Sequence, residues 1–479
     1  MFLGVDLGTS GVKALLITDD QSVIGEATAP LSVSRPAPGW SEQDPADWID
    51  ATRSALGALA AAHDLSGVQG IGLSGQMHGA TLLDAADRVL RPCILWNDTR
   101  AFAEAAALDA DPRFRARTGN IVFPGFTAPK LAWCRAQEPD IFARTAMVLL
   151  PKDYLRLWLT GDHVSDMSDA AGTSWLNTGA RDWDEALLAA THLGRDQMPR
   201  LVEGSDTSGE LRADVAAEFG MTAGIPVAGG GADNAAAAVG VGIARQGEAF
   251  VSLGTSGVLL AASDGYAPDP DTALHSFCHA LPGLWYQMGV ILAAADALTW
   301  LGRLVGESSA SLTTDLGALQ APGRPLFLPY LGGERTPHND AHVRGVFTGL
   351  EHATDRAAAT RAVLEGVAFA FRDSLEAMAA TGTAPDRVIA VGGGAASDYW
   401  LDVIATTLDL PVAVPAHGDL GAAFGAARLA MMASGRGGAE LAAPPRITRT
   451  IAPQTRLSAA FSDRYQRFRS TYSAIKDLP

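Results

Sequence analysis

The chain carries the hexapeptide Leu7-Gly8-Thr9-Ser10-Gly11-Val12 twice, and the second copy is Leu253-Gly254-Thr255-Ser256-Gly257-Val258. The two copies stand about half a chain apart in a sequence of 479 residues. A repeated segment at such an offset is typical of a duplicated structural unit. The repeat therefore predicts two related halves, and the alternative is a pair of unrelated hairpin turns that both favour Gly and Thr.

Each copy lies between two strand-like runs, residues 2–5 and 12–17 for the first copy and residues 249–252 and 258–262 for the second. This pattern predicts a strand, a glycine turn and a second strand. Glycine permits positive φ and leaves no Cβ in the way of a ligand, so N–H groups and hydroxyls of the turn can converge on phosphate oxygens. We predict two turns that hold a triphosphate between them.

A single carboxylate, Asp6, precedes the first turn, whereas Ser252 has the matching place in the second copy. One carboxylate next to phosphates suits one Mg²⁺ ion bound through water. The alternative is a strand-end residue that caps its own turn. The sequence contains no P-loop motif, and Gln76 stands where a nucleophile-elbow hydrolase has its second glycine.

A second carboxylate, Asp233, follows the three glycines 229–231 and lies just upstream of the second turn. A strand, a glycine turn and a helix that begins near Asp233 would present this side chain to a cleft. We predict that Asp233 accepts the proton of a sugar hydroxyl as it attacks the γ-phosphate, and that Asn234 orients the same substrate. An ordinary helix N-cap is the alternative.

Two polar clusters, residues 74–80 and 96–100, follow strand-like runs, where open α/β sheets present ligand-binding groups. Their side chains supply hydrogen-bonding groups and apolar walls for a polyol. The candidate sugar ligands are Met77, His78, Trp96 and Asn97. As alternatives, His78 is a satisfied loop histidine, and Arg100 serves only to pair with Asp98.

The composition limits the classes of protein to consider. The length exceeds what one core usually holds, so two or more domains are expected. A net charge of −17, with acidic residues spread along the chain, argues against a nucleic-acid partner. Three separated cysteines fit a reducing compartment, and neither a signal peptide nor a membrane-spanning apolar run is evident. We expect a cytoplasmic protein without a membrane partner.

Longer motifs spread over the whole chain resemble the FGGY family of carbohydrate kinases. They are residues 6–13, 40–45, 75–84, 94–98, 124–131, 150–157, 165–173 and 333–339. The resemblance implies an α/β fold of two actin-like (ribonuclease H-like) domains, residues 1–243 and 244–479, with a nucleotide cleft between them. A chain of this kind commonly forms a homodimer, which stays an expectation here.

The resemblance also implies roles for particular residues. Asp233 would be the catalytic base, Asp6 would support Mg²⁺, and Met77 and His78 would touch the sugar. Residues 125–137, with Lys130 and Trp133, resemble the first family signature. The implied ATP contacts are Gly8, Thr9, Ser10, Lys13, Gly254, Thr255, Gly393, Gly394, Ala395 and Asp398.

The implied reaction is in-line phosphoryl transfer from ATP to the terminal hydroxyl of a ketopentose, D-xylulose, which yields a sugar 5-phosphate and ADP. Three alternatives stay open: a related kinase for another ketose or polyol, such as ribulose, glycerol or gluconate; a non-kinase actin-like ATPase; and a nucleotide-dependent sugar sensor without chemistry. The sequence does not decide the orientation of a single hydroxyl.

Overall fold

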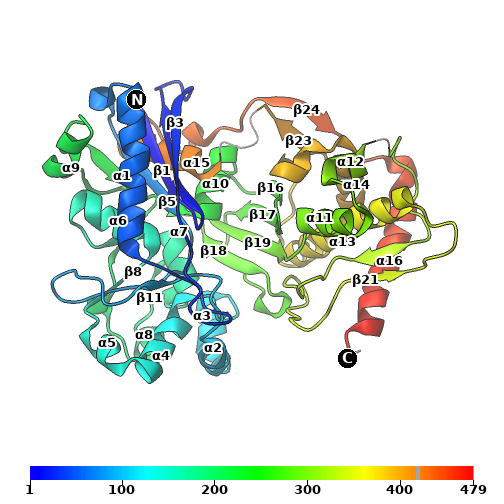
Figure 1. Cartoon of the computed structure of the whole chain (residues 1–479), viewed down its shortest axis with the longest axis horizontal. Helices are drawn as coiled ribbons and strands as arrows, with labels where there is room; N and C mark the ends of the chain where they lie inside the picture. The colour runs from blue at the N-terminus through cyan, green and yellow to red at the C-terminus, as the bar shows by residue number, and fades with distance from the viewer. Residues whose placement is uncertain (315, 417–420, 478–479) are drawn as a thin grey trace.

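The computed structural model describes residues 1–314, 316–416 and 421–477, and two mixed β-sheets organise these residues (Figure 1). The order in the first sheet is β13 (Thr207–Glu210), β14 (Pro226–Ala228), β5 (Ile71–Gly75), β1 (Phe2–Leu7), β2 (Gly11–Ile17) and β3 (Val23–Pro30), and β15 (Gly231–Ala232) also pairs with β5. The order in the second sheet is β18 (His275–Cys278), β19 (Trp285–Ile291), β17 (Gly257–Ser263), β16 (Glu248–Leu253), β22 (Arg387–Val391), β23 (Val412–Pro415) and β24 (Ile447–Ile451).

The two sheets repeat one arrangement of strands around the duplicated hexapeptide. In the first sheet β1 is antiparallel to β2 and parallel to β5, and in the second β16 is antiparallel to β17 and parallel to β22. Each copy of the hexapeptide spans the turn of the hairpin. The predicted strand–turn–strand units are therefore confirmed in both halves.

The identical copies nevertheless close turns of different register. Leu7 pairs with Val12, whereas Leu253 pairs with Gly257, one residue closer to the turn. In the second turn the carbonyl oxygen of Gly254 accepts a hydrogen bond from the N–H of Ala295, at the start of α11 (Ala295–Val305), over 2.9 Å. A contact with a distant helix thus helps to set the local geometry of the second turn.

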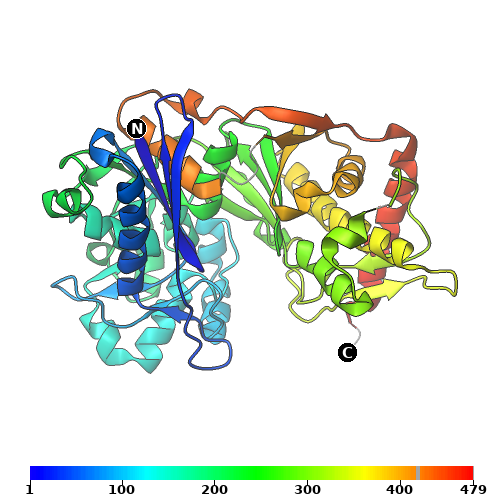
Figure 2. The same ribbon diagram turned by 45° about the horizontal axis from the view of Figure 1, so that its top comes forward.

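Helices cover both faces of the first sheet. On one face lies α1 (Pro45–Ala62), and on the other lies α15 (Gly421–Ala433), which comes from the second half of the sequence (Figure 2). Glycines permit this contact, because a Cβ at Gly72 would stand 1.8 Å from the carbonyl oxygen of Ala426. The chain therefore returns to the first sheet after building most of the second.

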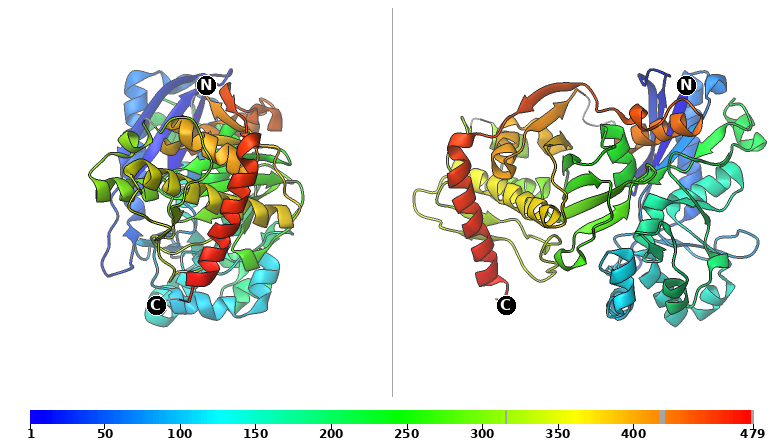
Figure 3. Two further views of the ribbon diagram at one scale, coloured as in Figure 1. Left: turned by 90° about the vertical axis from the view of Figure 1, so that its right-hand side faces the viewer. Right: turned by 180° about the vertical axis from the view of Figure 1, so that it is seen from behind.

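A helix pair joins the two halves, since α15 also packs against α10 (Asp233–Val241) (Figure 3). A Cβ at Gly425 would stand only 1.7 Å from the carbonyl oxygen of Ala236. Because α10 begins at Asp233, this close packing fixes the helix that carries the predicted base.

The first half also contains short helices and short paired strands. The helices are α2 (Phe102–Asp109), α3 (Pro112–Thr118), α4 (Thr127–Gln137), α5 (Pro139–Arg144), α6 (Pro151–Thr160), α7 (Met167–Ala170), α8 (Glu185–Ala190) and α9 (Ala213–Glu218). The paired short strands are β4 (Glu42–Gln43) with β7 (Cys93–Ile94), β6 (Thr81–Leu83) with β8 (Met147–Leu149), β9 (Val164–Asp166) with β12 (Arg200–Val202), and β10 (Leu176–Asn177) with β11 (Asp182–Trp183).

The second half adds the long helix α13 (Arg356–Ala380), which packs against β19 and β20 (Leu326–Leu328). The remaining elements are α12 (Ser309–Thr313), β21 (Val346–Thr348), α14 (Asp398–Leu408) and α16 (Ser458–Ile475). Within the described residues, no helix combines the length and the apolar character needed to cross a membrane.

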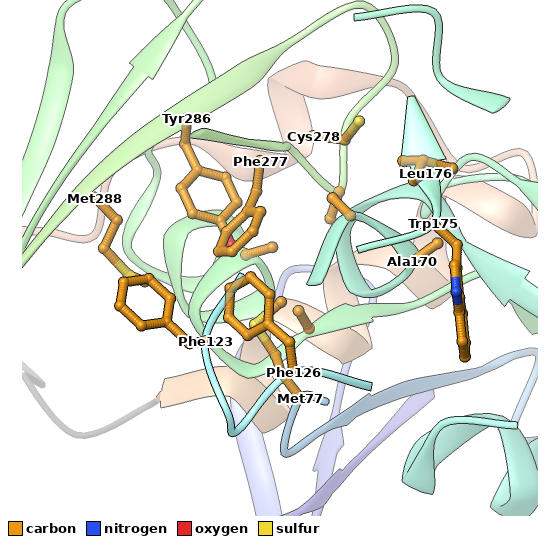
Figure 4. Packing of buried hydrophobic residues seen from close by; sticks show 14 of the residues in the cluster. Met77, Phe123, Phe126, Ala170, Trp175, Leu176, Phe277, Cys278, Tyr286 and Met288 are labelled. Atoms are coloured by element: carbon orange, nitrogen blue, oxygen red, sulfur yellow. The ribbon is translucent and has the colours of Figure 1, made fainter. Parts of the chain in front are cut away.

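The hydrophobic core is continuous between the halves. Met77 and Phe126 of the first half belong to the same buried cluster as Phe277, Tyr286 and Met288 of the second (Figure 4). Strands β18 and β19 therefore pack against the region that the sequence predicts to bind sugar.

Candidate active site

The β-sheet register brings the two predicted carboxylates to one edge of the first sheet. Asp6 on β1 pairs with Ser74 on β5, and Ser74 also pairs with Gly231 on β15, two residues before Asp233. Because these strands are parallel, their carboxyl ends meet at the same edge, where open sheets present functional groups.

Asp233 has the properties of a general base. Its Oδ1 atom accepts hydrogen bonds from the backbone N–H of Asn234 over 2.6 Å and from Asn234 Nδ2 over 2.9 Å. Among the described residues no side chain donates to Oδ2. Burial, and then the negative charge of Asp6, raise the pKa of Asp233 to about 6, against the hydrogen bonds from Asn234. A carboxylate with a pKa near neutrality and one free oxygen suits proton abstraction.

Asp6 fits a hydrated divalent cation. Burial raises the pKa of Asp6, while the neighbouring Ser74 hydroxyl and the charge of Lys13 oppose the increase. Its Oδ1 atom is buried and has no hydrogen-bond partner in the described part of the chain. Residues 1–314, 316–416 and 421–477 contain no group of three or more His, Cys, Asp or Glu arranged to hold a metal. Mg²⁺ needs no such cage, because one or two carboxylates, water and substrate phosphates suffice.

Hydrogen bonds with neighbouring side chains hold Thr9 of the first turn in place. The Thr9 hydroxyl donates to Gln76 Oε1 over 3.1 Å and accepts from Trp96 Nε1 over 2.9 Å. Gln43 Nε2 donates to the Thr9 carbonyl oxygen over 2.8 Å. The proton of the Thr9 hydroxyl is thus directed at Gln76, and a phosphate contact at Thr9 is left to the backbone N–H.

His78 is held rigidly in a neutral state. Its φ of +68° is left-handed, its ring stacks on Phe126 with centroids 4.4 Å apart, and Nδ1 lies 2.7 Å from the carbonyl oxygen of Gly172. Since a carbonyl only accepts, Nδ1 carries the proton and Nε2 remains an acceptor. Burial is the main cause that lowers the pKa of His78 to about 3.

Lys130 supports His78 from behind. Its Nζ atom donates to the carbonyl oxygens of His78 and Gly125, each over 2.7 Å. The side chain is fully buried, and burial lowers its pKa to about 7. Lys130 therefore fixes the backbone that presents His78.

The other predicted sugar ligands differ in their surroundings. Met77 is buried, whereas the Trp96 side chain is 47% exposed and can offer an apolar wall. Asn97 has a buried Oδ1 atom without a hydrogen-bond partner among the described residues. Arg100 forms ion pairs with Asp98, with 2.7 Å between Nη2 and Oδ2, and with Glu42, with 2.7 Å between Nη1 and Oε1, so its pairing is not limited to Asp98.

In the second half, the predicted ATP contacts Gly393, Gly394 and Ala395 lie beside the second turn. Gly393, Gly394 and Ala395 form a short 3₁₀ helix after β22, and a Cβ at Gly394 would stand 2.8 Å from the Cβ of Leu253. Asp398 is 72% exposed and forms an ion pair with Arg449. A contact between Asp398 and adenine would compete with this ion pair.

Sequence reasoning gave no role to a buried cluster of charges behind the Asp233 loop. Lys152 Nζ lies 2.6 Å from Asp153, 2.7 Å from Asp166 and 3.2 Å from Asp169, and all four side chains are inaccessible to solvent. Arg156 joins the cluster and donates to the carbonyl oxygen of Ala228 over 2.6 Å. The motifs 150–157 and 165–173 contain these residues, but their convergence depends on the fold.

The class of protein follows from the comparison with known families. The FGGY family of carbohydrate kinases matches through its N-terminal domain over residues 1–240 and its C-terminal domain over residues 249–434. The chain belongs to this family and is a sugar kinase, so the predicted family and fold class are confirmed.

Individual relatives are similar over their full lengths. The chain is 48% identical to the xylulose kinase of Escherichia coli K12 over 483 residues, which cover 100% of each chain. It is 61% identical to a crystal structure of a "xyloylose kinase" from Brucella ovis, with a TM-score of 0.98 and full coverage of both chains. The xylulose kinase structure from Rhodospirillum rubrum is 32% identical, with a TM-score of 0.93 and coverage of 99% of this chain and 98% of the other.

Proposed function

We propose that this kinase transfers the γ-phosphoryl group of ATP to the terminal hydroxyl of D-xylulose and produces D-xylulose 5-phosphate and ADP. The observation that carries the proposal is the Asp233 carboxylate, which lies at the same sheet edge as Asp6 and the first turn and whose Oδ2 accepts no hydrogen bond from the part of the chain that the structure describes. The full-length similarity to xylulose kinases supports the choice of ketose.

In this mechanism Asp233 Oδ2 takes the proton from the sugar hydroxyl, and Asn234 keeps Oδ1 in place. The hydroxyl oxygen forms a bond to the γ-phosphorus while the bond from that phosphorus to the bridging oxygen breaks and ADP leaves. His78 Nε2 accepts a hydrogen bond from another sugar hydroxyl, and Met77 and Trp96 contact the carbon skeleton. Most of the acceleration comes from positioning and electrostatics.

The nucleotide is held by residues of both halves. Its proposed contacts are Gly8, Thr9, Ser10 and Lys13 from the first half and Gly254, Thr255, Gly393, Gly394, Ala395 and Asp398 from the second. Lys13 faces Asp6 across the β1–β2 pair, and its Nζ lies 3.1 Å from Glu26 in this structure. An approaching triphosphate would offer Lys13 a stronger anionic partner than that exposed carboxylate.

Asp6 is the proposed ligand of Mg²⁺, through water. When bound, the ion would neutralise charge that develops on the phosphates. Replacement of Asp6 by Asn should raise the Mg²⁺ concentration needed for half-maximal activity. An unchanged Mg²⁺ dependence would remove Asp6 from this role.

A panel of ketoses and polyols assayed with ATP and Mg²⁺ tests the proposed substrate. ADP release is followed in a coupled assay, and the phosphorylated product is identified by mass spectrometry. D-xylulose should give the highest kcat/KM, ahead of ribulose, glycerol and gluconate. A higher value for any of those three would replace D-xylulose as the substrate, and ADP release that is independent of sugar would contradict kinase activity toward the panel.

A further inference from the structure

Arg335 lies in the motif 333–339, to which the proposed function gives no role. Its loop is tied to β19: Thr336 N–H donates to the Val290 carbonyl oxygen over 3.1 Å, and Val290 N–H donates to Thr336 Oγ1 over 3.0 Å. Glu334 Oε1 accepts the N–H of Leu292 over 3.0 Å. The fold therefore fixes the point from which the Arg335 side chain extends.

A row of aromatic rings in contact connects Arg335 with His78, a predicted sugar ligand of the first half. The guanidinium carbon lies 4.0 Å from the ring centroid of Phe123. The Phe123 and Phe126 centroids are 5.5 Å apart, and Phe126 stacks on His78 at 4.4 Å. Figure 4 shows Phe123 and Phe126 near Met77, opposite Phe277 of the second half. Arg335 thus reaches the His78 region from the second half.

The guanidinium lacks an anionic partner in residues 1–314, 316–416 and 421–477, since no carboxylate there lies within 4.0 Å of it and no side-chain hydrogen bond from it is formed. Burial lowers the pKa of Arg335 to about 10, which leaves it charged at neutral pH. Arg335 is half-buried, and its guanidinium stacks on Phe123 without donating a side-chain hydrogen bond to any described residue. Its N–H donors are therefore available to a ligand with oxygen acceptors.

Aromatic contacts place Arg335 close to the predicted sugar ligands. Phe123, on which the guanidinium stacks, also lies 5.4 Å from the ring of His275, centroid to centroid. The charge of Arg335 contributes to the lowered pKa values of His78 and His275. Arg335 therefore approaches the His78 region from the second half.

We propose that Arg335 is a specificity-determining residue that binds the C1 hydroxyl and C2 carbonyl oxygens of the ketose, at the end opposite the phosphorylated hydroxyl. The planar guanidinium presents parallel N–H donors that match two adjacent oxygens. The sugar then bridges the two halves, with His78 and Asp233 on one side and Arg335 on the other. This inference rests on the proposed function.

The test compares Arg335→Met and Arg335→Lys with the unaltered enzyme. A matched control is Arg303→Met, because the Arg303 side chain is 68% exposed and lies on the same half. KM and kcat are measured for D-xylulose, 1-deoxy-D-xylulose and ATP, and sugar binding without nucleotide is measured by calorimetry. Circular dichroism and a thermal melt check the fold of each variant.

Arg335→Met should raise KM for D-xylulose at least tenfold and leave KM for ATP within twofold. The preference for D-xylulose over its 1-deoxy analogue should shrink in the same variant, a change that a purely structural role would not produce. Arg335→Lys keeps the charge and loses the paired donors, so its KM for D-xylulose should lie between those of the unaltered enzyme and Arg335→Met. This variant serves as the test if Arg335→Met does not fold. Arg303→Met should match the parent.

An unchanged sugar KM, an unchanged preference against the analogue, or a parallel rise in KM for ATP would overturn the assignment of Arg335. Each of these three outcomes is measured on an enzyme that phosphorylates D-xylulose. They would therefore contradict the role of Arg335 and not the proposed function. Absence of D-xylulose phosphorylation by the unaltered enzyme would instead overturn the proposed function, and the assignment of Arg335 with it.

Discussion

Replacement of Gly425 by Ala perturbs the helix pair that joins the halves. The added Cβ would stand 1.7 Å from the Ala236 carbonyl oxygen and 2.9 Å from the Gly240 nitrogen, whereas ordinary contacts begin at 3.4 Å. Both obstacles are backbone atoms of α10, so no side chain can rotate away. Helices α10 and α15 must then separate by roughly 1.5 Å, and overpacking of this kind costs about 3 kcal/mol.

The same displacement should impair catalysis, because α10 begins at Asp233. A misplacement of about 1 Å in a catalytic group can cost on the order of 100-fold in rate. Gly425→Ala should therefore lower both the urea midpoint of unfolding and kcat, although residue 425 is remote in sequence from every proposed ligand.

Gly57→Ala is the matched control. Gly57 lies in the exposed face of α1, and an added Cβ there has no neighbour within 4 Å. The same substitution at this site should stabilise the protein by about 0.5–1 kcal/mol, because Ala loses less backbone entropy than Gly in a helix. A Gly425→Ala protein with the urea midpoint and kcat of the parent would refute the packing argument.

Two further predictions concern ionisable groups. First, kcat/KM should fall as the pH drops through about 6, because Asp233 must be unprotonated to accept the sugar proton and its pKa is raised to about 6; a flat profile between pH 5 and about 8 would contradict this. Second, Lys152→Met should destabilise the protein by about 3–5 kcal/mol in urea unfolding, because it leaves the buried Asp166 and Asp169 without their cation. A variant as stable as the parent would show that the cluster relaxes by taking up a proton.

Local features of the sequence predicted much of this site. The repeated hexapeptide located both hairpins because glycine turns between apolar runs specify their own geometry. The glycine-rich approach to Asp233 and the helix start at this residue are also local signals, and from them the sequence placed Asp233 just upstream of the second turn. The structure confirms that a helix begins at Asp233. The common sheet edge of Asp233 and Asp6 depends on the pairing of β1 and β15 with β5, which local signals do not specify.

Other features depend on contacts between distant segments and could not be predicted. The glycines of α15 look like those of any small-residue helix, and only the folded chain shows that α15 returns to the first sheet. The register of the second turn involves α11, and the guanidinium of Arg335 meets Phe123 of the other half. The boundary between units 1–243 and 244–479 stays a prediction.

The most direct test of the account is the turnover of Asp233→Asn with D-xylulose, ATP and Mg²⁺. This substitution keeps the shape of the side chain and removes its capacity to take a proton. The account predicts a fall in kcat of about 100-fold or more, with the Kd for ATP and the thermal midpoint close to those of the parent. A kcat within a few-fold of the parent would contradict the central role of this carboxylate.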